Sequence, residues 1–316
     1  MTTGVLLANL GTPRTPGVAD VRAYLREFLG DPKVVQAPRL VWWPVLHGLI
    51  LPFRAPKSAE LYRRIWTSQG SPLLVHSRAQ ARGLAERLGT PTPVALGMRY
   101  GEPSLAAGLT ELQASGCRRV LLLPMFPQWS VTTTGTLEEA AARECARRGL
   151  ELRTVPPFHS HPAYIRALAS AVREGTKAEP EHLVLSFHGL PEAYVRRGDP
   201  YRDHCRSTAE QLVRELGLRP ERWSLAFQSR FGPQPWLQPY LEPHLVALAR
   251  EHRRVVLATP GFLADCLETL EELGLRARER FREAGGEELA IVPCLNERPE
   301  FLEALAVIVR DSLRAG

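Results

Sequence analysis

Short apolar runs that end in Gly, Pro or Asn alternate along this chain with segments of helical periodicity, and this alternation restricts the fold more than any other feature. In the helical segments, apolar residues recur every three or four positions. Strands separated by helices pair in parallel, and a parallel sheet needs helices over both of its faces. The expected strands are Val5–Ala8, Val94–Leu96, Arg119–Leu123, Leu152–Val155, Leu183–Phe187, Trp223–Phe227, Arg254–Ala258 and Leu289–Val292, and the expected helices include Ala79–Leu88, Ser104–Ala114, Leu137–Arg148, Ala163–Arg173, Ser207–Leu216 and Pro299–Leu313.

The length of 316 residues is too great for one small core and fits two domains of ordinary size. The strand and helix rhythm of the first half recurs in the second half, and the strongest break between the halves is Pro156-Pro157. The sequence therefore predicts two Rossmann-like α/β domains, 1–157 and 158–316, with a cleft between them. Each domain should hold a parallel sheet of about four strands flanked by helices.

Composition excludes several classes of protein. The hydrophobic fraction of 44% and the charged fraction of 23% are those of a globular chain, and the most apolar stretch, Leu40–Phe53, is shorter than the roughly 20 residues that span a bilayer. The net charge of +6 comes from arginines interspersed with glutamates, so no basic stripe for nucleic acid forms. Five cysteines without a C-x-x-C pair, and an N-terminus without a signal peptide, predict a cytoplasmic protein.

The segments that follow the expected strands are where a ligand should bind, because ligands of such folds lie beyond the carboxyl ends of the strands. These segments are rich in aromatic and apolar residues and contain few charges. Neither G-x-G-x-x-G nor G-x-x-x-x-G-K-[ST] occurs, so the usual sequence support for a nucleotide cofactor is missing. A planar, mostly apolar ligand suits these segments better.

His188 directly follows the expected strand Leu183–Phe187 and precedes Gly189. An imidazole at the end of a buried strand is placed to bind a borderline metal such as ferrous iron, or to accept a proton near neutral pH. The alternative is a core histidine whose hydrogen bonds are satisfied, and His188 by itself leaves both interpretations open.

Three carboxylates, Asp265, Glu268 and Glu272, occur at positions i, i+3 and i+7 after the Pro260-Gly261 pair. This spacing predicts that all three lie on one face of a helix, close to the carboxyl edge of the second sheet, where His188 also emerges. A solvated acidic face would have the same spacing.

Seven motifs in order along the chain, from about residue 4 to residue 310, resemble the ferrochelatase family. Their number makes the resemblance far more specific than any one of them. They are Asn9-Leu-Gly-Thr-Pro13, Gly70-Ser-Pro72, Gly97-Met-Arg-Tyr100, Leu123-Pro-Met-Phe-Pro-Gln128, Ser186-Phe-His-Gly-Leu-Pro191, Phe227-Gln-Ser-Arg-Phe-Gly232 with Trp236-Leu237, and Pro260-Gly-Phe-Leu-Ala-Asp-Cys-Leu-Glu-Thr-Leu270.

The resemblance implies a chelatase-like fold and an enzyme that inserts Fe²⁺ into protoporphyrin IX, forming protohaem in the last step of haem biosynthesis. Insertion into coproporphyrin III, and a non-catalytic two-domain protein that binds a tetrapyrrole, are the alternatives. Iron and porphyrin are then substrates. The family's iron ligands and catalytic residues correspond to His188 and Glu268, and its acidic path for metal or protons to Asp265 and Glu272.

The family's porphyrin-binding residues correspond to Leu10, Arg99, Tyr100 and Trp236. Tyr100 and Trp236 could instead be core aromatics, and Arg99 a surface ion-pair partner.

This chain departs from part of the family at Cys266, where some members have a second histidine. The cysteine spacing does not match that of cluster-binding members, so we expect no iron–sulfur cluster and no tightly bound cofactor. The segment at Trp42-Trp43 corresponds to a hydrophobic lip that could touch a membrane surface or an upstream enzyme, although a helix buried in the domain or in a dimer is the alternative.

Overall fold

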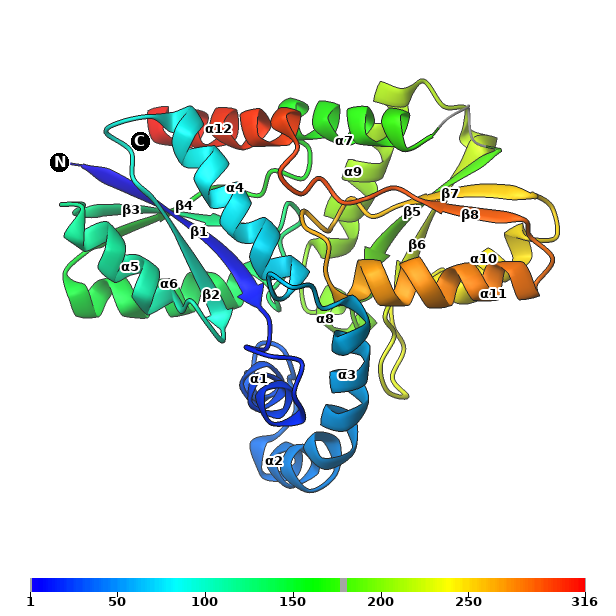
Figure 1. Cartoon of the computed structure of the whole chain (residues 1–316), viewed down its shortest axis with the longest axis horizontal. Helices are drawn as coiled ribbons and strands as arrows, with labels where there is room; N and C mark the ends of the chain where they lie inside the picture. The colour runs from blue at the N-terminus through cyan, green and yellow to red at the C-terminus, as the bar shows by residue number, and fades with distance from the viewer. Residues whose placement is uncertain (1, 177–180, 316) are drawn as a thin grey trace. The chain divides into compact units, whose positions relative to one another are not determined.

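The computed structural model describes residues 2–176 and 181–315 (Figure 1). The chain forms two compact units. The first consists of Met1–Phe126, Ser130–Pro156 and Ala306–Gly316, and the second of Pro127–Trp129 and Pro157–Leu305. This division differs from the expected domains 1–157 and 158–316, because a short loop after β3 belongs to the second unit and the end of the chain returns to the first.

The first unit is built on a parallel four-stranded sheet with the strand order β2-β1-β3-β4. Side chains of β1 point alternately to the two faces, and both faces are covered, so Val5, Leu6, Leu7 and Ala8 are all inaccessible to solvent. The strands are β1 (Thr3–Gly11), β2 (Val94–Tyr100), β3 (Arg119–Pro124) and β4 (Glu151–Thr154).

Helices cover both faces of this sheet. Leu6, Ala8 and their neighbours pack on α5 (Leu105–Ala114) and α6 (Thr134–Arg148) in one hydrophobic cluster. Helix α4 (Pro72–Leu88) lies on the opposite face (Figure 1).

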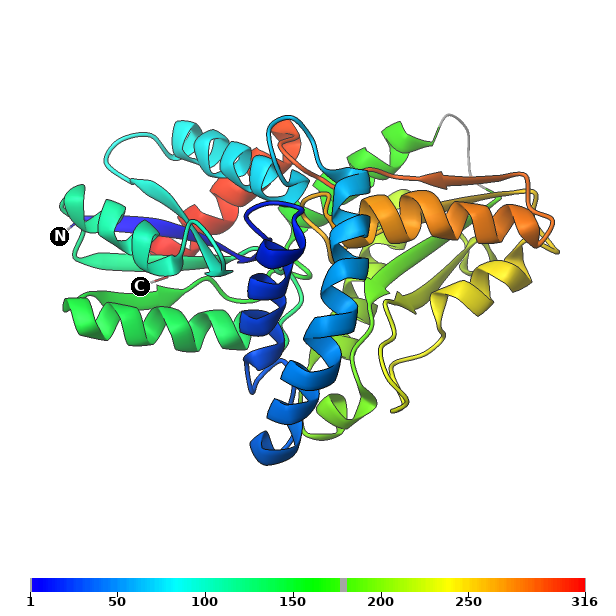
Figure 2. The same ribbon diagram turned by 60° about the horizontal axis from the view of Figure 1, so that its bottom comes forward.

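A long connection, made mostly of helices, joins β1 to β2 in the first unit. It contains α1 (Val18–Gly30), α2 (Arg39–Val45), the π-helical segment η1 (Leu46–Ile50) and α3 (Leu51–Ile65) before α4. Figure 2 shows α1 and α3 side by side. This connection carries five large apolar side chains that are half exposed or more. We name them the exposed apolar surface: Leu40, Val41, Trp43, Leu49 and Phe53.

The second unit repeats this plan with the parallel strand order β6-β5-β7-β8. Its strands are β5 (His182–His188), β6 (Trp223–Gln228), β7 (Arg254–Ala258) and β8 (Glu288–Ile291).

One face of the second sheet packs on α10 (Leu241–Leu248), the π-helical segment η3 (Glu268–Ala277) and α11 (Arg278–Glu283). Val184 of β5 belongs to this cluster, together with Leu273 of η3. Helices α7 (Pro162–Gly175) and α9 (Tyr201–Leu216) lie on the other side (Figure 1). The second unit also contains α8 (Glu192–Arg196) and η2 (Pro220–Arg222). Helix α12 (Pro299–Arg314) begins in the second unit and belongs to the first from Ala306 onward.

The predicted α/β class, with two parallel four-stranded sheets flanked by helices, is confirmed. Each of the eight expected strands overlaps an observed one. Several observed strands extend further than expected, because the ladder includes end residues that are not apolar, such as Thr3, Gly11 and His188. Over the described residues, every helix is too short or too polar to span a lipid bilayer.

Candidate active site

The order of strands in the second sheet marks one position for a ligand. The chain passes from β5 to β6 on one side of β5 and then to β7 on its other side. The carboxyl ends of β5 and β7 are therefore the point where the strand order reverses, and such points bind ligands in open α/β sheets. Strand β5 continues beyond its pairing with β7 at Leu185, so that Ser186, Phe187 and His188 project past the end of β7.

His188 is the last residue of β5 and is partly buried. Because side chains alternate along a strand, His188 points to the same face of the sheet as Val184, which is the face that η3 covers. Its Nδ1 lies 2.7 Å from the carbonyl oxygen of Gly189. A carbonyl only accepts a hydrogen bond, so Nδ1 carries the proton and Nε2 of the neutral ring keeps its lone pair for a metal or a proton.

Gly189 has no room for a side chain. A Cβ atom at this position would lie 2.7 Å from the carbonyl oxygen of Gln228 and 3.0 Å from the ring of Trp236. The same carbonyl accepts the Gly189 amide at 2.7 Å, and Trp236 forms an antiparallel bridge with Pro191. The structure therefore places Trp236, a predicted porphyrin-binding residue, directly against the turn that follows His188.

The predicted helix face of three carboxylates is wrong for Asp265, because the helix begins after it. Segment η3 starts at Glu268 and is a π-helix, in which each hydrogen bond joins residue i to residue i+5. The ion pair between Arg276 Nε and Glu271, at 2.8 Å, has this same spacing of five. Residues four and five apart therefore share a face, which keeps Glu268 and Glu272 together.

Asp265 is engaged in holding the start of this segment. Its Oδ1 accepts a hydrogen bond from the Thr269 hydroxyl at 2.9 Å, and its Oδ2 accepts one from the Asn296 side-chain amide at 2.7 Å. The Asp265 amide in turn donates to Oδ1 of Asn296 at 2.8 Å. The carboxylate thus anchors the loop before η3.

Glu272 accepts two hydrogen bonds from Ser229, the residue that directly follows β6. The amide and the hydroxyl of Ser229 donate to its two carboxylate oxygens at 2.9 and 2.6 Å. Burial raises the pKa of Glu272, the hydrogen bonds from Ser229 and the nearby His188 lower it, and the charge of Glu268 raises it; the net shift is upward. Glu272 therefore shares one electrostatic environment with His188 and Glu268, and it holds a proton at higher pH than an ordinary glutamate.

Ser229 was not among the predicted site residues. It adopts a left-handed backbone with φ of 63°, which is uncommon outside glycine and asparagine and often marks a functional position. Two signals were available: its place just after the expected strand Trp223–Phe227, and its place inside the family-like motif Phe227–Gly232.

Cys266, which stands where some family members have a histidine, is buried. Burial and the adjacent Glu268 raise the pKa of its thiol well above the ordinary value, so the thiol stays neutral. Among residues 2–176 and 181–315, no group of three or more His, Cys, Asp or Glu side chains is arranged to hold a metal ion.

Leu10, Arg99 and Tyr100, the remaining predicted porphyrin-binding residues, lie together in the first unit. Leu10 is next to the last residue of β1, and Gly11 pairs with Tyr100 at the end of β2. A Cβ atom on Gly11, whose φ is 111°, would lie 1.9 Å from the Tyr100 carbonyl oxygen, so this close pairing requires glycine.

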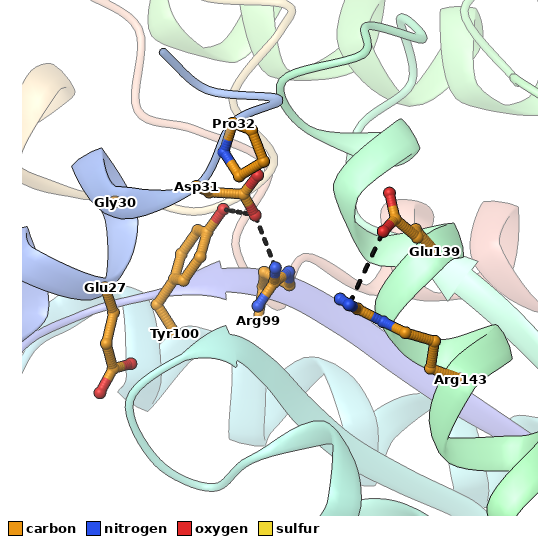
Figure 3. Close-up of a pocket in the computed structure, with 8 residues that line it drawn as sticks. All are labelled: Glu27, Gly30, Asp31, Pro32, Arg99, Tyr100, Glu139 and Arg143. Carbon is orange, nitrogen blue, oxygen red and sulfur yellow. Dashed lines mark hydrogen bonds and ion pairs between the residues drawn. The ribbon is translucent and has the colours of Figure 1, made fainter. Parts of the chain in front are cut away.

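Arg99 and Tyr100 line a cavity of about 410 Å³ in the first unit (Figure 3). Its other lining residues are Glu27, Gly30, Asp31, Pro32, Glu139 and Arg143. The phenol of Tyr100 is buried, and both it and the Arg99 guanidinium donate to the carboxylate of Asp31. Asp31 was not predicted, since its partners are 68 and 69 positions away.

Comparison with known proteins gives a consistent result along the whole chain. A family model described as Ferrochelatase matches residues 2–313. A protein of Aromatoleum aromaticum named ferrochelatase is 49% identical over 320 residues, covering 98% of this chain and 88% of that protein. A Klebsiella pneumoniae protein of the same name is 46% identical over 312 residues, covering 96% of each.

Among solved structures, SirB from Bacillus subtilis with Fe³⁺ superposes with a TM-score of 0.62, covering 99% of this chain and 96% of that chain. The sequence identity of 11% makes this a similarity of fold alone.

Proposed function

The chain belongs to the ferrochelatase family, and we propose that the porphyrin it metallates is protoporphyrin IX. As a ferrochelatase it is a lyase of haem biosynthesis that inserts iron into a porphyrin. The family match over residues 2–313 carries this conclusion.

Insertion of Fe²⁺ makes three demands on a protein. The macrocycle must bend so that its nitrogen lone pairs become accessible, two pyrrole N–H protons must leave, and the ion must lose its water. A close-packed apolar site can hold a bent ligand at a cost of about 1–5 kcal/mol drawn from binding elsewhere. The protons need an acceptor whose pKa lies near the working pH.

We propose that His188 and Glu268 meet the second and third demands, each binding iron and accepting protons. The hydrogen bond from Nδ1 of His188 to the Gly189 carbonyl leaves Nε2 as the one basic atom of the neutral ring. Glu268 begins η3 on the sheet face to which His188 points. An imidazole with a carboxylate is a donor set that suits ferrous iron.

Glu272 is proposed as the next group on a path for protons or metal. Its raised pKa suits a carboxylate that takes a proton and passes it on, and Ser229 keeps both of its oxygens in place. We keep Asp265 in this proposed acidic path because its motif matches that of the ferrochelatase family. Its hydrogen bonds with Thr269 and Asn296 suit a supporting role there.

Leu10, Arg99, Tyr100 and Trp236 are proposed to contact the porphyrin. Trp236 supports this role best, because its ring lies against Gly189 beside His188. Its indole N–H is buried and has no hydrogen-bond partner among the described residues.

The choice of protoporphyrin IX is supported by the exposed apolar surface on α2, η1 and α3. Leu40 is 92% exposed and Phe53 65%, and single-chain proteins seldom leave such a set uncovered without a use for it. Protoporphyrin IX has vinyl groups where coproporphyrin III has two further carboxylates, so it is the more apolar of the two and the better match.

An anaerobic insertion assay tests the enzyme and its substrate together. The purified chain is mixed with Fe²⁺ and either protoporphyrin IX or coproporphyrin III, and the absorption spectrum follows conversion of free base to metalloporphyrin. Faster conversion of protoporphyrin IX supports the proposal. Faster conversion of coproporphyrin III overturns the substrate, and no conversion of either overturns the activity.

We also propose a cytoplasmic enzyme that touches the membrane surface, or an upstream enzyme, through the exposed apolar surface. Its five cysteines are free and buried, as suits a reducing compartment. Replacing Trp43 and Phe53 with serine should reduce co-sedimentation with liposomes, while Leu275→Ser, which changes a half-exposed leucine of the second unit, should not. Equal co-sedimentation of all variants would exclude the membrane contact.

A further inference from the structure

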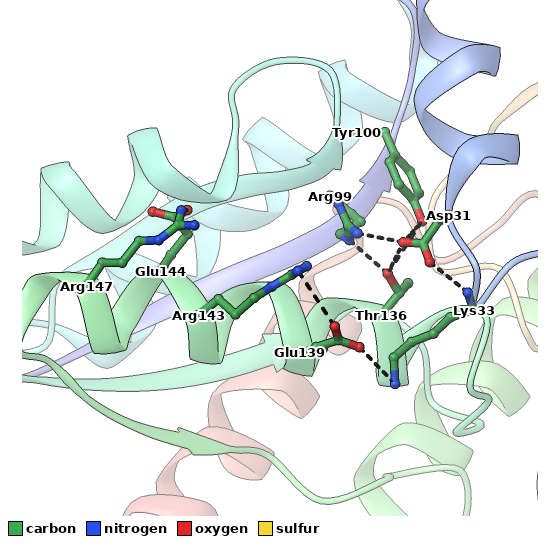
Figure 4. Close-up of polar contacts among 9 residues, drawn as sticks. All are labelled: Asp31, Lys33, Arg99, Tyr100, Thr136, Glu139, Arg143, Glu144 and Arg147. Atoms are coloured by element: carbon green, nitrogen blue, oxygen red, sulfur yellow. Dashed lines mark hydrogen bonds and ion pairs between the residues drawn. The ribbon is translucent and has the colours of Figure 1, made fainter. Parts of the chain in front are cut away.

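Asp31 joins three elements of the first unit through one carboxylate (Figure 4). It follows the last residue of α1, and its Oδ2 accepts hydrogen bonds from Nη2 of Arg99 at 2.5 Å, the hydroxyl of Tyr100 at 2.9 Å and the hydroxyl of Thr136 at 2.7 Å. Its Oδ1 accepts the Lys33 amide at 2.8 Å. The end of α1, the end of β2 and the first turn of α6 therefore meet at this group.

The surroundings of Asp31 keep it ionised. The side chain is 5% exposed, and burial alone would raise its pKa, but the hydrogen bonds from Thr136, the Lys33 amide and Tyr100, together with the charge of Arg99, lower it overall. A buried carboxylate with four donors and one paired cation is a fixed negative charge.

Arg99 is fixed at more than one point as a result. Its Nε donates to the Thr136 hydroxyl at 2.8 Å, its Nη2 donates to Asp31, and its guanidinium carbon lies 4.7 Å from the centre of the Tyr100 ring. A planar guanidinium held by two hydrogen bonds and a ring has little freedom to rotate. Figure 3 shows Arg99 and Tyr100 on the wall of the cavity, with Asp31 beside both.

We propose that Asp31 is a positioning residue for porphyrin binding, which acts by holding Arg99 and Tyr100 in the orientation that the porphyrin contacts. This inference rests on the proposed function, because the contact of Arg99 and Tyr100 with porphyrin is itself proposed there. It adds a residue that none of the seven family-like motifs contains. Asp31 itself makes no contact with the substrate in this account and takes no part in proton transfer.

The effect of Asp31 should therefore fall on porphyrin binding and leave the chemical step unchanged. In Asp31→Asn the volume is kept, but the charge that orients Arg99 is lost. We expect KM for protoporphyrin IX to rise about tenfold, with kcat and KM for Fe²⁺ within about twofold of wild type. Fluorescence titration of the metal-free porphyrin should show the same loss of affinity without any turnover.

Two variants separate positioning from general support of the fold. Asp20→Asn makes the same change within α1, the helix that Asp31 follows, at a carboxylate that accepts from Arg14 and Thr15 at the surface, and it should leave both KM values unchanged. Asp31→Asn combined with Arg99→Lys should weaken porphyrin binding by less than the product of the single effects, because both act through one guanidinium.

The outcomes distinguish this inference from the proposed function. Wild-type protein that metallates no porphyrin removes the proposed function and, with it, the inference. Active wild type with an Asp31→Asn variant that binds porphyrin normally, or that loses kcat and both affinities alike, overturns the inference alone. Should Asp31→Asn fail to fold, Thr136→Val decides in its place: weaker porphyrin binding supports the positioning role and unchanged binding overturns it.

Discussion

His182 and His188 are the first and last residues of strand β5 and point to the same face of the sheet, yet their surroundings differ. His182 is 6% exposed, its Nε2 shares a hydrogen bond with the Ser224 hydroxyl at 2.9 Å, and burial together with His252 and His244 lowers its pKa to about 4. His188 is more exposed, and its side chain hydrogen-bonds through Nδ1 to the backbone carbonyl of Gly189.

The contrast shows which surroundings make a histidine a candidate catalytic or metal-binding residue. Both imidazoles end the same buried strand, so residue type and burial pattern do not separate them. His182 lies at the amino end, where burial lowers its pKa and its Nε2 shares a hydrogen bond with Ser224. His188 lies at the carboxyl end, where the strand order reverses and where Nδ1 bonds to the Gly189 carbonyl, so that Nε2 of the neutral ring keeps its lone pair.

The strongest test of this contrast is alanine at each end of β5. His188→Ala should lower the rate of iron insertion by at least about 100-fold, because it removes the proposed proton acceptor and metal ligand. His182→Ala should leave the rate of the folded protein within about threefold. The measurement is the anaerobic rate of metalloporphyrin formation, with near-ultraviolet circular dichroism to confirm folding. Similar rates for the two variants would break the contrast.

Gly189→Ala tests how closely the carboxyl end is packed. The added methyl group would meet the Gln228 carbonyl at 2.7 Å and the Trp236 ring at 3.0 Å, and neither is the end of a flexible chain. We expect a loss of about 2 kcal/mol in the free energy of unfolding, with a change in tryptophan fluorescence. Gly48→Ala is the control, because nothing lies within 4 Å of the Cβ it would add. Unchanged urea unfolding of Gly189→Ala would show that this turn has more space than the structure gives it.

His182 also makes the stability of the second unit depend on pH. Its folded pKa of about 4 is below the unfolded value of 6.5, so its contribution is complete above pH 6.5 and is lost as the pH falls towards 4, where the unfolded chain binds the proton first. The groups that face it are His244, His252, Arg222 and the Glu221 backbone.

His182→Gln keeps a donor or acceptor for Ser224 but cannot titrate. Between pH 7.5 and 5 the wild type should lose roughly 1–2 kcal/mol more unfolding free energy than this variant. Urea unfolding at several pH values measures the difference. His47→Gln, a change at an exposed histidine, should follow the wild type. Parallel pH profiles for wild type and His182→Gln would assign the acid sensitivity to another group.

The sequence was informative wherever a pattern is local. Apolar runs located the eight strands, and the position of His188 after one of them put it at the correct edge of the sheet. The same runs are buried on both sides, which is why they read as nearly continuous apolar segments.

What the sequence did not reveal depends on long-range packing. The acids after Gly261 fit an α-helix by spacing, but the segment is a π-helix that starts only at Glu268, which removes Asp265 from the row. The contacts of Asp31 reach residues 68, 69 and 105 positions away, and no local spacing encodes them. The left-handed conformation of Ser229 is equally invisible, because serine normally avoids it.

Ser229→Ala is the finest probe of the carboxyl end of the sheet, because it removes one hydroxyl and keeps the backbone amide on Glu272. That hydroxyl lowers the pKa of Glu272, so its loss should raise this pKa further and keep the carboxyl protonated to higher pH. If Glu272 receives protons from His188, the acid limb of the pH–rate profile moves to higher pH. The insertion rate then falls by about fivefold at the acid end and little at the alkaline end. Ser229→Gly lacks the same hydroxyl but suits the φ of 63°. If the two variants show the same shifted profile, the effect belongs to the hydroxyl. If their profiles differ, it belongs to the backbone. If both keep the wild-type profile, Glu272 lies outside the path of the protons.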